Sequence, residues 1–304
     1  MGGQSDAQPH LRSWLALFAV YIFWGTTYLG IRVALESFPP ALLLGLRFTL
    51  SGAVLLASAP LLKMRIPTGA EARRTAFCGF LTLGIGTGCL CMAEQWVPSG
   101  LAALFITTSP FWMISVDAII PGGERFHKKV LWGMVVGLCG TLLLLAPVGG
   151  SAGLDMGQGK LALGFVVLQL GNIGWCFGSI LQRRSTSTAH PVMSGAVQQF
   201  AVGLMFLIPS LLLQGREAHW DLKGAGAILY LSTFGSIVGY SAFLYTLETM
   251  PVAIVTTYNY VNPAVAVFLG WLFYREPLGW REVSAMAIIF LGVAIVRRMQ
   301  GSKK

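Results

Sequence analysis

Long apolar segments recur along the whole chain, and they constrain its fold more than any other feature. Each is about 20 residues long, which is the length a helix needs to cross the hydrocarbon core of a bilayer. We identify ten, at residues 14–35, 41–62, 74–97, 99–120, 130–147, 160–181, 192–213, 224–248, 252–274 and 282–298. The connections between them are too short for a soluble domain. The sequence therefore predicts an all-α, polytopic membrane protein with ten transmembrane helices.

The composition excludes several other classes of protein. Hydrophobic residues fill 55% of the 304 positions and charged residues only 11%, whereas a soluble globular protein has about 25% charged residues. The net charge of +9 is explained by basic loops on the cytoplasmic side of a membrane, so we expect no nucleic-acid partner. All five cysteines lie inside apolar segments, and neither a disulfide framework nor a metal site is expected.

The distribution of lysine and arginine predicts the orientation in the membrane. If the N-terminus is cytoplasmic, the cytoplasmic ends of the segments hold 14 of these residues and the opposite ends hold 6. Such an excess marks the cytoplasmic side of a membrane protein. We therefore expect a multi-pass protein of the cell (inner) membrane, with both the N- and C-termini in the cytoplasm.

An internal repeat relates the two halves of the chain, with an offset of 151 to 153 residues. The matched pairs are Trp24 and Trp175, Pro40 and Pro191, Gly52 and Gly203, Pro98 and Pro251, Pro110 and Pro263, Glu124 and Glu276, and Gly140 and Gly292. Each half holds five segments, an odd number, so the second copy must enter the membrane from the opposite side. The sequence predicts two inverted repeats, at 14–147 and 160–298, with a site between them near the middle of the membrane.

Five short motifs carry a family resemblance. They are Trp24-Gly25-Thr26-Thr27-Tyr28, Glu36-Ser37-Phe38-Pro39-Pro40, Ala93-Glu94-Gln95, Val97-Pro98-Ser99-Gly100 and Tyr258-Asn259-Tyr260-Val261-Asn262-Pro263. In these motifs, and from about residue 14 to residue 298, the chain resembles the EamA family of the drug/metabolite transporter superfamily, most of all its YedA-like branch. The resemblance implies ten helices in two EamA repeats, an inner-membrane location and the export of metabolites. It does not imply a particular substrate.

Arg47 is the one lysine or arginine that lies well inside a predicted span. An intramembrane arginine costs at least about 2.5 kcal/mol and usually faces the interior of the bundle with a partner. Glu94 lies at a similar depth on the same side of the membrane, so we predict an ion pair between the two. The pair could bind a substrate carboxylate or a coupling ion, with Glu94 as the coupling candidate, or it could simply fix two helices.

Polar and aromatic residues also gather near the middle of several segments, where lipid would not select them. Trp24 and Trp175 are too deep for the aromatic belts of a membrane protein and are expected to line a cavity. Serine and threonine hydroxyls at this depth can instead bond to the helix backbone. The predicted substrate-binding residues are Trp24, Thr27, Tyr28, Arg47, Glu94, Gln95, Asn172, Trp175, Tyr258 and Asn259.

Two further patterns concern the motion and packing of the helices. Pro110 and Pro263 are repeat mates inside predicted helices, and paired interruptions of this kind indicate the binding region of a transporter, so both are predicted hinges. Gly133 and Gly137 form a small-residue face that suits packing within the chain or the contact of a dimer.

Motifs for catalysis and for ATP use are missing from the sequence. It contains no phosphate-binding loop and no nucleophile elbow, and its four histidines all fall in termini or loops. We expect no enzyme activity and no cofactor. The leading interpretation is a secondary transporter that exports small metabolites, such as amino acids or related amphipathic compounds, by alternating access; the alternative is an intramembrane enzyme or a non-transporting sensor. The expected partners are a small-molecule substrate, the lipid bilayer and a proton or other coupling ion, in a monomer or a weak homodimer.

Overall fold

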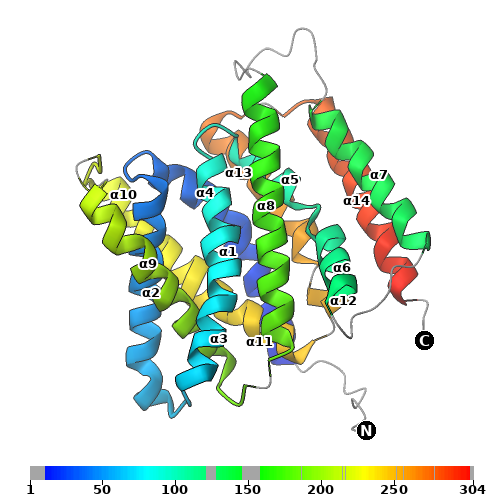
Figure 1. The fold of residues 1–304 in the computed structure, drawn as a ribbon. Helices are drawn as coiled ribbons and strands as arrows, with labels where there is room; N and C mark the ends of the chain where they lie inside the picture. Colours follow the sequence, from blue (N-terminus) through cyan, green and yellow to red (C-terminus); the bar gives the residue numbers. More distant parts are fainter. Residues whose placement is uncertain are drawn as a thin grey trace, which may run out of the picture.

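The computed structural model describes residues 11–120, 128–145, 158–185, 187–213, 215, 217–250, 252–255, 257–276 and 278–301. Every regular element in this part of the chain is a helix (Figure 1). The first half contains α1 (Leu11–Leu35), α2 (Pro40–Leu62), α3 (Gly69–Gly79), η1 (Phe80–Thr87), α4 (Gly88–Ala93), α5 (Ser99–Ile106), α6 (Ser109–Ile119) and α7 (Lys128–Leu145). The second half contains α8 (Gln158–Arg183), α9 (Pro191–Leu213), α10 (Leu222–Tyr230), η2 (Leu231–Tyr240), α11 (Ser241–Thr249), α12 (Val252–Val255), α13 (Tyr258–Tyr274) and α14 (Trp280–Gly301).

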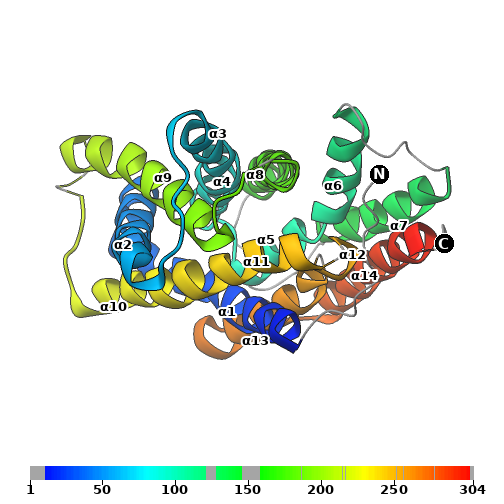
Figure 2. The same cartoon turned by 90° about the horizontal axis from the view of Figure 1, so that it is seen from below.

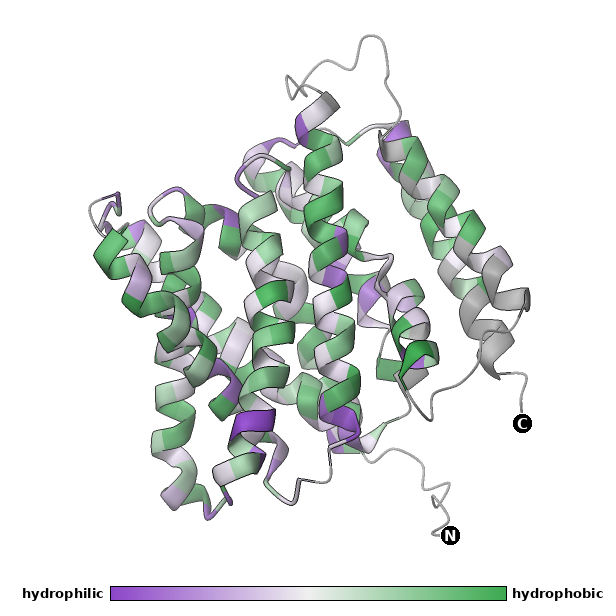
Figure 3. Ribbon diagram, viewed as in Figure 1, coloured by the Kyte–Doolittle hydropathy of each residue, from purple (hydrophilic) through white to green (hydrophobic). Residues whose placement is uncertain are grey.

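Apolar residues dominate the helices (Figure 3). Many large hydrophobic side chains of these helices are exposed on the surface. Among the described residues, seven helices are long and apolar enough to cross a membrane, and Val261–Tyr274 is a shorter apolar helix. The prediction of an all-helical polytopic membrane protein is confirmed at this level. Pro40 and Pro191 each begin a helix. A backbone N–H at the start of a helix has no partner within the helix, so proline, which lacks this N–H, costs no hydrogen bond there.

Helices α2 and α9 pack closely through a reciprocal pair of glycines. A Cβ atom on Gly52 would lie 2.5 Å from the backbone nitrogen of Phe200, and one on Gly203 would lie 2.2 Å from that of Thr49. Thr49 and Phe200 stand 151 positions apart, as Gly52 and Gly203 do. The same contact is therefore made twice, once from each half of the chain.

Helices α7 and α14 lie side by side at one end of the molecule, and their contact is reciprocal as well (Figures 1 and 2). A Cβ on Gly140 would lie 2.9 Å from the carbonyl oxygen of Ala285, and one on Gly292 would lie 2.7 Å from that of Gly133. Gly137 also faces this contact, because its backbone nitrogen lies 2.4 Å from the Cβ position of Gly292. The small-residue face of α7 thus packs against α14 of the same chain.

Both predicted hinge prolines follow a break between two helices. The chain leaves α5 at Ile106 and begins α6 at Ser109, so Pro110 lies in the first turn of α6. In the second half α12 ends at Val255, α13 begins at Tyr258, and Pro263 lies inside α13. Motion at these breaks remains a prediction.

The two π-helical segments η1 and η2 occupy matching positions in the halves. They begin at Phe80 and Leu231, which are 151 positions apart. Each contains a glycine at the matching position, Gly84 or Gly235. Hydropathy gave no sign of these segments, and π-helical turns often occur at functional sites.

Candidate substrate-binding cavity

A cavity of about 90 Å³ lies between the helices of both halves. A single water needs about 10–15 Å³ measured in this way, so the cavity is larger than a water site. Its walls come from α1, α2, η1, α4, α5, α6, α8, η2 and α13, which include both π-helical segments. Seven predicted site residues line it: Trp24, Thr27, Tyr28, Arg47, Asn172, Trp175 and Tyr258.

An aromatic cluster around Trp24 forms one wall of the cavity. The ring of Trp24 meets its repeat mate Trp175 edge to face at 5.4 Å between centroids, and Tyr258 in the same way at 5.3 Å. Phe243 and Tyr240 complete the cluster, at 4.9 and 6.4 Å from Trp24. Offset-stacked and edge-to-face pairs are the geometries that aromatic rings prefer. The cluster therefore joins α1, α8, η2, α11 and α13 in the core.

A buried polar network lies next to this cluster. The Tyr240 hydroxyl donates to Oε1 of Gln198, and Nε2 of Gln198 donates to Oε1 of Gln182 at 2.8 Å. The hydroxyls of Thr82 and Tyr240 are 3.2 Å apart. Gln182 lies one residue before the end of α8, so the network extends toward the face of the molecule that holds the α8–α9 connection. These four side chains bond to one another, and none of them but Tyr240 lines the cavity.

Arg47 comes to the cavity from the opposite face, seven residues after the start of α2. Its side chain is 5% exposed, and its Nε donates to the Ser236 hydroxyl of η2 at 2.8 Å. Its Nη1 atom has no hydrogen-bond partner. The guanidinium of Arg47 therefore lies at the cavity wall, and its Nη1 atom can still donate hydrogen bonds.

The predicted ion pair between Arg47 and Glu94 is wrong. Glu94 is fully buried, both of its carboxylate oxygens lack a hydrogen-bond partner, and it does not line the cavity. Depth along a helix does not fix the direction of a side chain, and η1 precedes Glu94 with turns that are wider than α-helical ones. The main-chain oxygen of Glu94 instead accepts a bond of 2.8 Å from Arg32.

Two other predicted residues also lie outside the lining of the cavity. Gln95 is exposed and donates to the main-chain oxygen of Met92 at 3.2 Å. Asn259 is buried, and its neighbour on the next turn, Asn262, lines the cavity in its place. The sequence reasoning missed Ser236 and Tyr240, although the matched glycines of η1 and η2 mark their segment.

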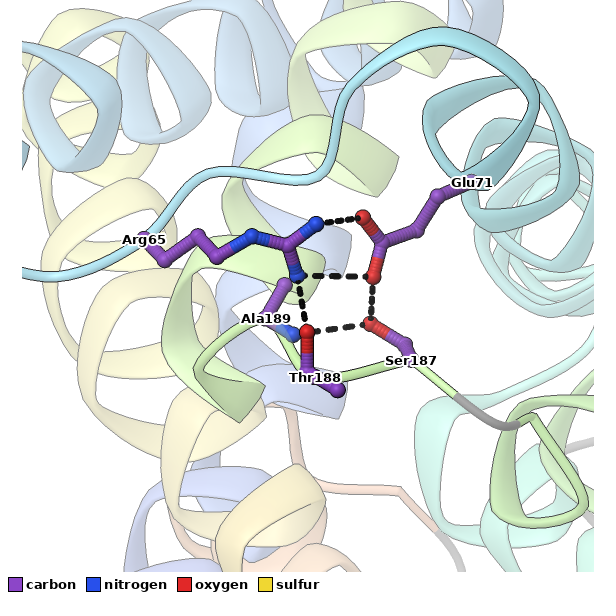
Figure 4. A network of polar contacts seen from close by, with 5 residues as sticks. All are labelled: Arg65, Glu71, Ser187, Thr188 and Ala189. Carbon is purple, nitrogen blue, oxygen red and sulfur yellow. Dashed lines mark hydrogen bonds and ion pairs between the residues drawn. The ribbon is translucent and has the colours of Figure 1, made fainter.

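Polar contacts join the two halves at one face of the molecule (Figure 4). Arg65, after α2, forms an ion pair with Glu71 of α3, with 2.8 Å between Nη2 and Oε2. Arg65 also donates to the Thr188 hydroxyl, and the Ser187 hydroxyl donates to Glu71. The α2–α3 connection of the first half is thereby held to the α8–α9 connection of the second.

A corresponding set of contacts joins the halves at the opposite face. Glu36, after α1, forms an ion pair with Lys223 of α10 and accepts a hydrogen bond from the Tyr274 hydroxyl. These two bonds hold the pKa of the Glu36 carboxyl below its ordinary value. Ser37 donates to Asp221 at 3.0 Å, and the pKa of Asp221 is lowered by the backbone N–H of Gly224 and then by this bond.

The contacts at the two faces are alike. Glu36 and Ser187 are repeat mates, 151 positions apart. Each bonds to a charged residue near the start of a helix of the other half, Lys223 of α10 or Glu71 of α3. Polar contacts therefore join loops of the two halves on both sides of the cavity.

Comparison with known proteins agrees with this arrangement. The chain matches the EamA-like transporter family over residues 11–146 and again over residues 162–298. It is 35% identical to the Uncharacterized inner membrane transporter YedA of Escherichia coli (strain K12) over 283 residues, which cover 92% of this chain and 89% of that protein. It is 27% identical to the Probable amino-acid metabolite efflux pump of the same strain, over 92% of this chain and 93% of that protein.

A solved structure described as "Crystal structure of protein" has a similar fold. The TM-score is 0.69 at 19% sequence identity, and the likeness covers 94% of this chain and 98% of that chain. At this identity the likeness concerns the fold alone.

Proposed function

Because the chain belongs to the EamA-like transporter family, we propose that it is a secondary transporter that exports small metabolites by alternating access. The observation that carries the proposal is one central cavity built from both halves, with polar contacts between the halves at each of the two faces. One relative is named a probable amino-acid metabolite efflux pump. We propose amino acids or related amphipathic compounds as the substrates here, with no enzyme activity.

We also propose ten transmembrane helices in two inverted five-helix repeats, at 14–147 and 160–298. The support comes from contacts that each half makes in the same way with the other. Gly52 and Gly203 meet mated backbone positions across α2 and α9, and Gly140 and Gly292 do so across α7 and α14. Inverted repeats exchange their conformations to open a site alternately to the two sides of a membrane.

An asymmetry within the aromatic cluster supports the same mechanism. Nε1 of Trp24 donates to the main-chain oxygen of Gly235 at 3.0 Å, whereas Nε1 of its mate Trp175 makes no corresponding bond to the main chain of η1. Gly84 stands where Gly235 does in the other half. In the opposite state of the transporter, Trp175 would bond to Gly84 while Trp24 leaves Gly235, with Pro110 and Pro263 as the hinges.

The coupling of transport to a gradient remains part of the proposal. Glu94 is our candidate for proton coupling, because the two oxygens of its buried carboxyl group have no hydrogen-bond partner in this state and a buried charge without hydrogen bonds is costly. Glu94 lies outside the cavity lining, so it would not contact the substrate. A change in its protonation would instead affect the packing of the helix ends around it.

Transport by purified protein in liposomes tests the proposed function. We expect saturable uptake of at least one compound from a panel of labelled metabolites, in a chemically unchanged form. An imposed pH gradient should change the rate if a proton is coupled. The proposal is wrong if correctly folded protein moves every compound no faster than protein-free liposomes do, or if mass spectrometry finds the compounds converted.

Topology reporters test the inverted arrangement and the membrane orientation. Fusions after Lys304 and within 63–74 should report the cytoplasm, and fusions within 150–158, which lie mostly outside the described residues, should report the outer side. The reason is the excess of lysine and arginine at the proposed cytoplasmic ends. A cytoplasmic signal from 150–158 would mean that both halves enter from the same side.

A further inference from the structure

The unused bonding capacity of Arg47 points to the chemistry of the substrate. Its guanidinium is buried and lines the cavity, Nε is bonded to the neutral Ser236 hydroxyl, and Nη1 is without a partner. Buried charges in proteins are ordinarily paired, and an ionisable residue inside a membrane protein marks a functional site by default. The missing partner is an anion.

No carboxylate of the protein fills this role in the described part of the chain. The described residues that line the cavity include no aspartate or glutamate, and the oxygens of Glu94 bond to nothing. The architecture does not require a cation at this point either. Gln198, the repeat mate of Arg47 at an offset of 151, is a neutral side chain whose amide is satisfied by Gln182 and Tyr240.

The remainder of the cavity is suited to an apolar body. Rings of Trp24, Trp175, Tyr28 and Tyr258 line it together with aliphatic side chains. Arg47 is the one charged residue among its described lining residues. One guanidinium balances the charge of one carboxylate, whereas a dianionic phosphate would keep an uncompensated charge in an apolar cavity, which is costly. Resting on the proposed function, we propose that the cavity selects substrates with one carboxylate on an apolar or aromatic body, and that Arg47 binds the carboxylate.

Binding of three matched probes to the purified protein tests this substrate class. Phenylacetate, phenylacetamide and 2-phenylethylamine share the ring and are similar in size, but they are anionic, neutral and cationic. Calorimetric titration should give the tightest binding for phenylacetate, with phenylacetamide roughly 10- to 100-fold weaker, the usual worth of a charge-assisted hydrogen bond. Benzylphosphonate, which can carry two charges, should bind more weakly than phenylacetate.

Three variants assign the preference to Arg47. Arg47→Gln should remove the preference for phenylacetate over phenylacetamide. Gly235→Ala keeps the charge but places a methyl group 2.8 Å from Nη2 of Arg47 and 2.8 Å from Cγ2 of Thr27, so it should reduce the preference by displacing the guanidinium. Lys160→Gln removes an exposed cation near the start of α8, away from the cavity lining, and should leave the preference unchanged.

The outcomes separate this inference from the proposed function. If wild-type protein binds phenylacetamide or 2-phenylethylamine as tightly as phenylacetate, the inference is wrong, even where liposomes show transport of neutral or cationic metabolites. If folded Arg47→Gln retains the anion preference, Arg47 is not the binding residue. Should Arg47→Gln fail to fold, Gly235→Ala decides the question, and an unchanged preference in that variant overturns the assignment.

Discussion

Replacing Gly203 with leucine is expected to eliminate the folded protein. The Cβ position at Gly203 lies 2.2 Å from the Thr49 nitrogen and 2.6 Å from the main-chain carbon of Phe48. These are backbone atoms of α2, so the side chain fits only if α2 and α9 separate. Overpacking of a core typically costs about 1–3 kcal/mol and sometimes more, and close approach at small residues is what holds membrane helices together. Size-exclusion chromatography in detergent should show aggregate and little monodisperse protein.

A glycine elsewhere in the chain supplies the control for this prediction. Gly226 of α10 has no atom within 4 Å of its Cβ position, so Gly226→Leu should behave like the wild type. Gly52→Leu should resemble Gly203→Leu, because the two positions make the same contact from opposite halves. A monodisperse Gly203→Leu protein with a wild-type melting temperature would contradict the reciprocal packing of α2 and α9.

The sequence predicted the positions of several helices well, because a long run of apolar residues can be read directly from the residue types. The segment 41–62 differs by one residue from α2, and 252–274 covers α12 and α13 together. Interruptions inside a segment are different, since a π-helical turn changes the hydrogen-bond partner and leaves the hydropathy unchanged. The π-helical turns of η1 and η2 therefore escaped the prediction, although the matched Gly84 and Gly235 are visible in the repeat.

The site was predictable where the repeat itself brings residues together. Trp24 and Trp175 are mates, both lie near the middle of their helices, and the structure places them in contact. Contacts between unrelated positions were not predictable in this way. Arg47 turns toward Ser236, a residue of the other half, and nothing in the spacing of Arg47 and Glu94 fixes the rotation of either helix. The role of these residues in binding stays a prediction.

The position of Trp24 makes it the side chain whose loss should affect transport most. It contacts four other rings of the aromatic cluster and holds the main chain of η2 through Gly235. Truncating a buried tryptophan to alanine costs about 3–5 kcal/mol in soluble cores. Because Trp24 partly faces the cavity, we expect a smaller loss of stability together with a large loss of function.

Trp24→Ala is therefore expected to reduce the rate of uptake into liposomes at least about tenfold, and to lower the melting temperature. Trp24→Phe retains an aromatic ring but not the bond to Gly235, so its rate should fall between those of Trp24→Ala and the wild type. Trp14 lies ten residues earlier on α1 with 47% of its surface exposed, and Trp14→Ala should transport normally. Uptake is measured per molecule of reconstituted protein. Wild-type rates in Trp24→Ala, or equal losses in Trp14→Ala and Trp24→Ala, would show that the aromatic cluster has no specific role in transport.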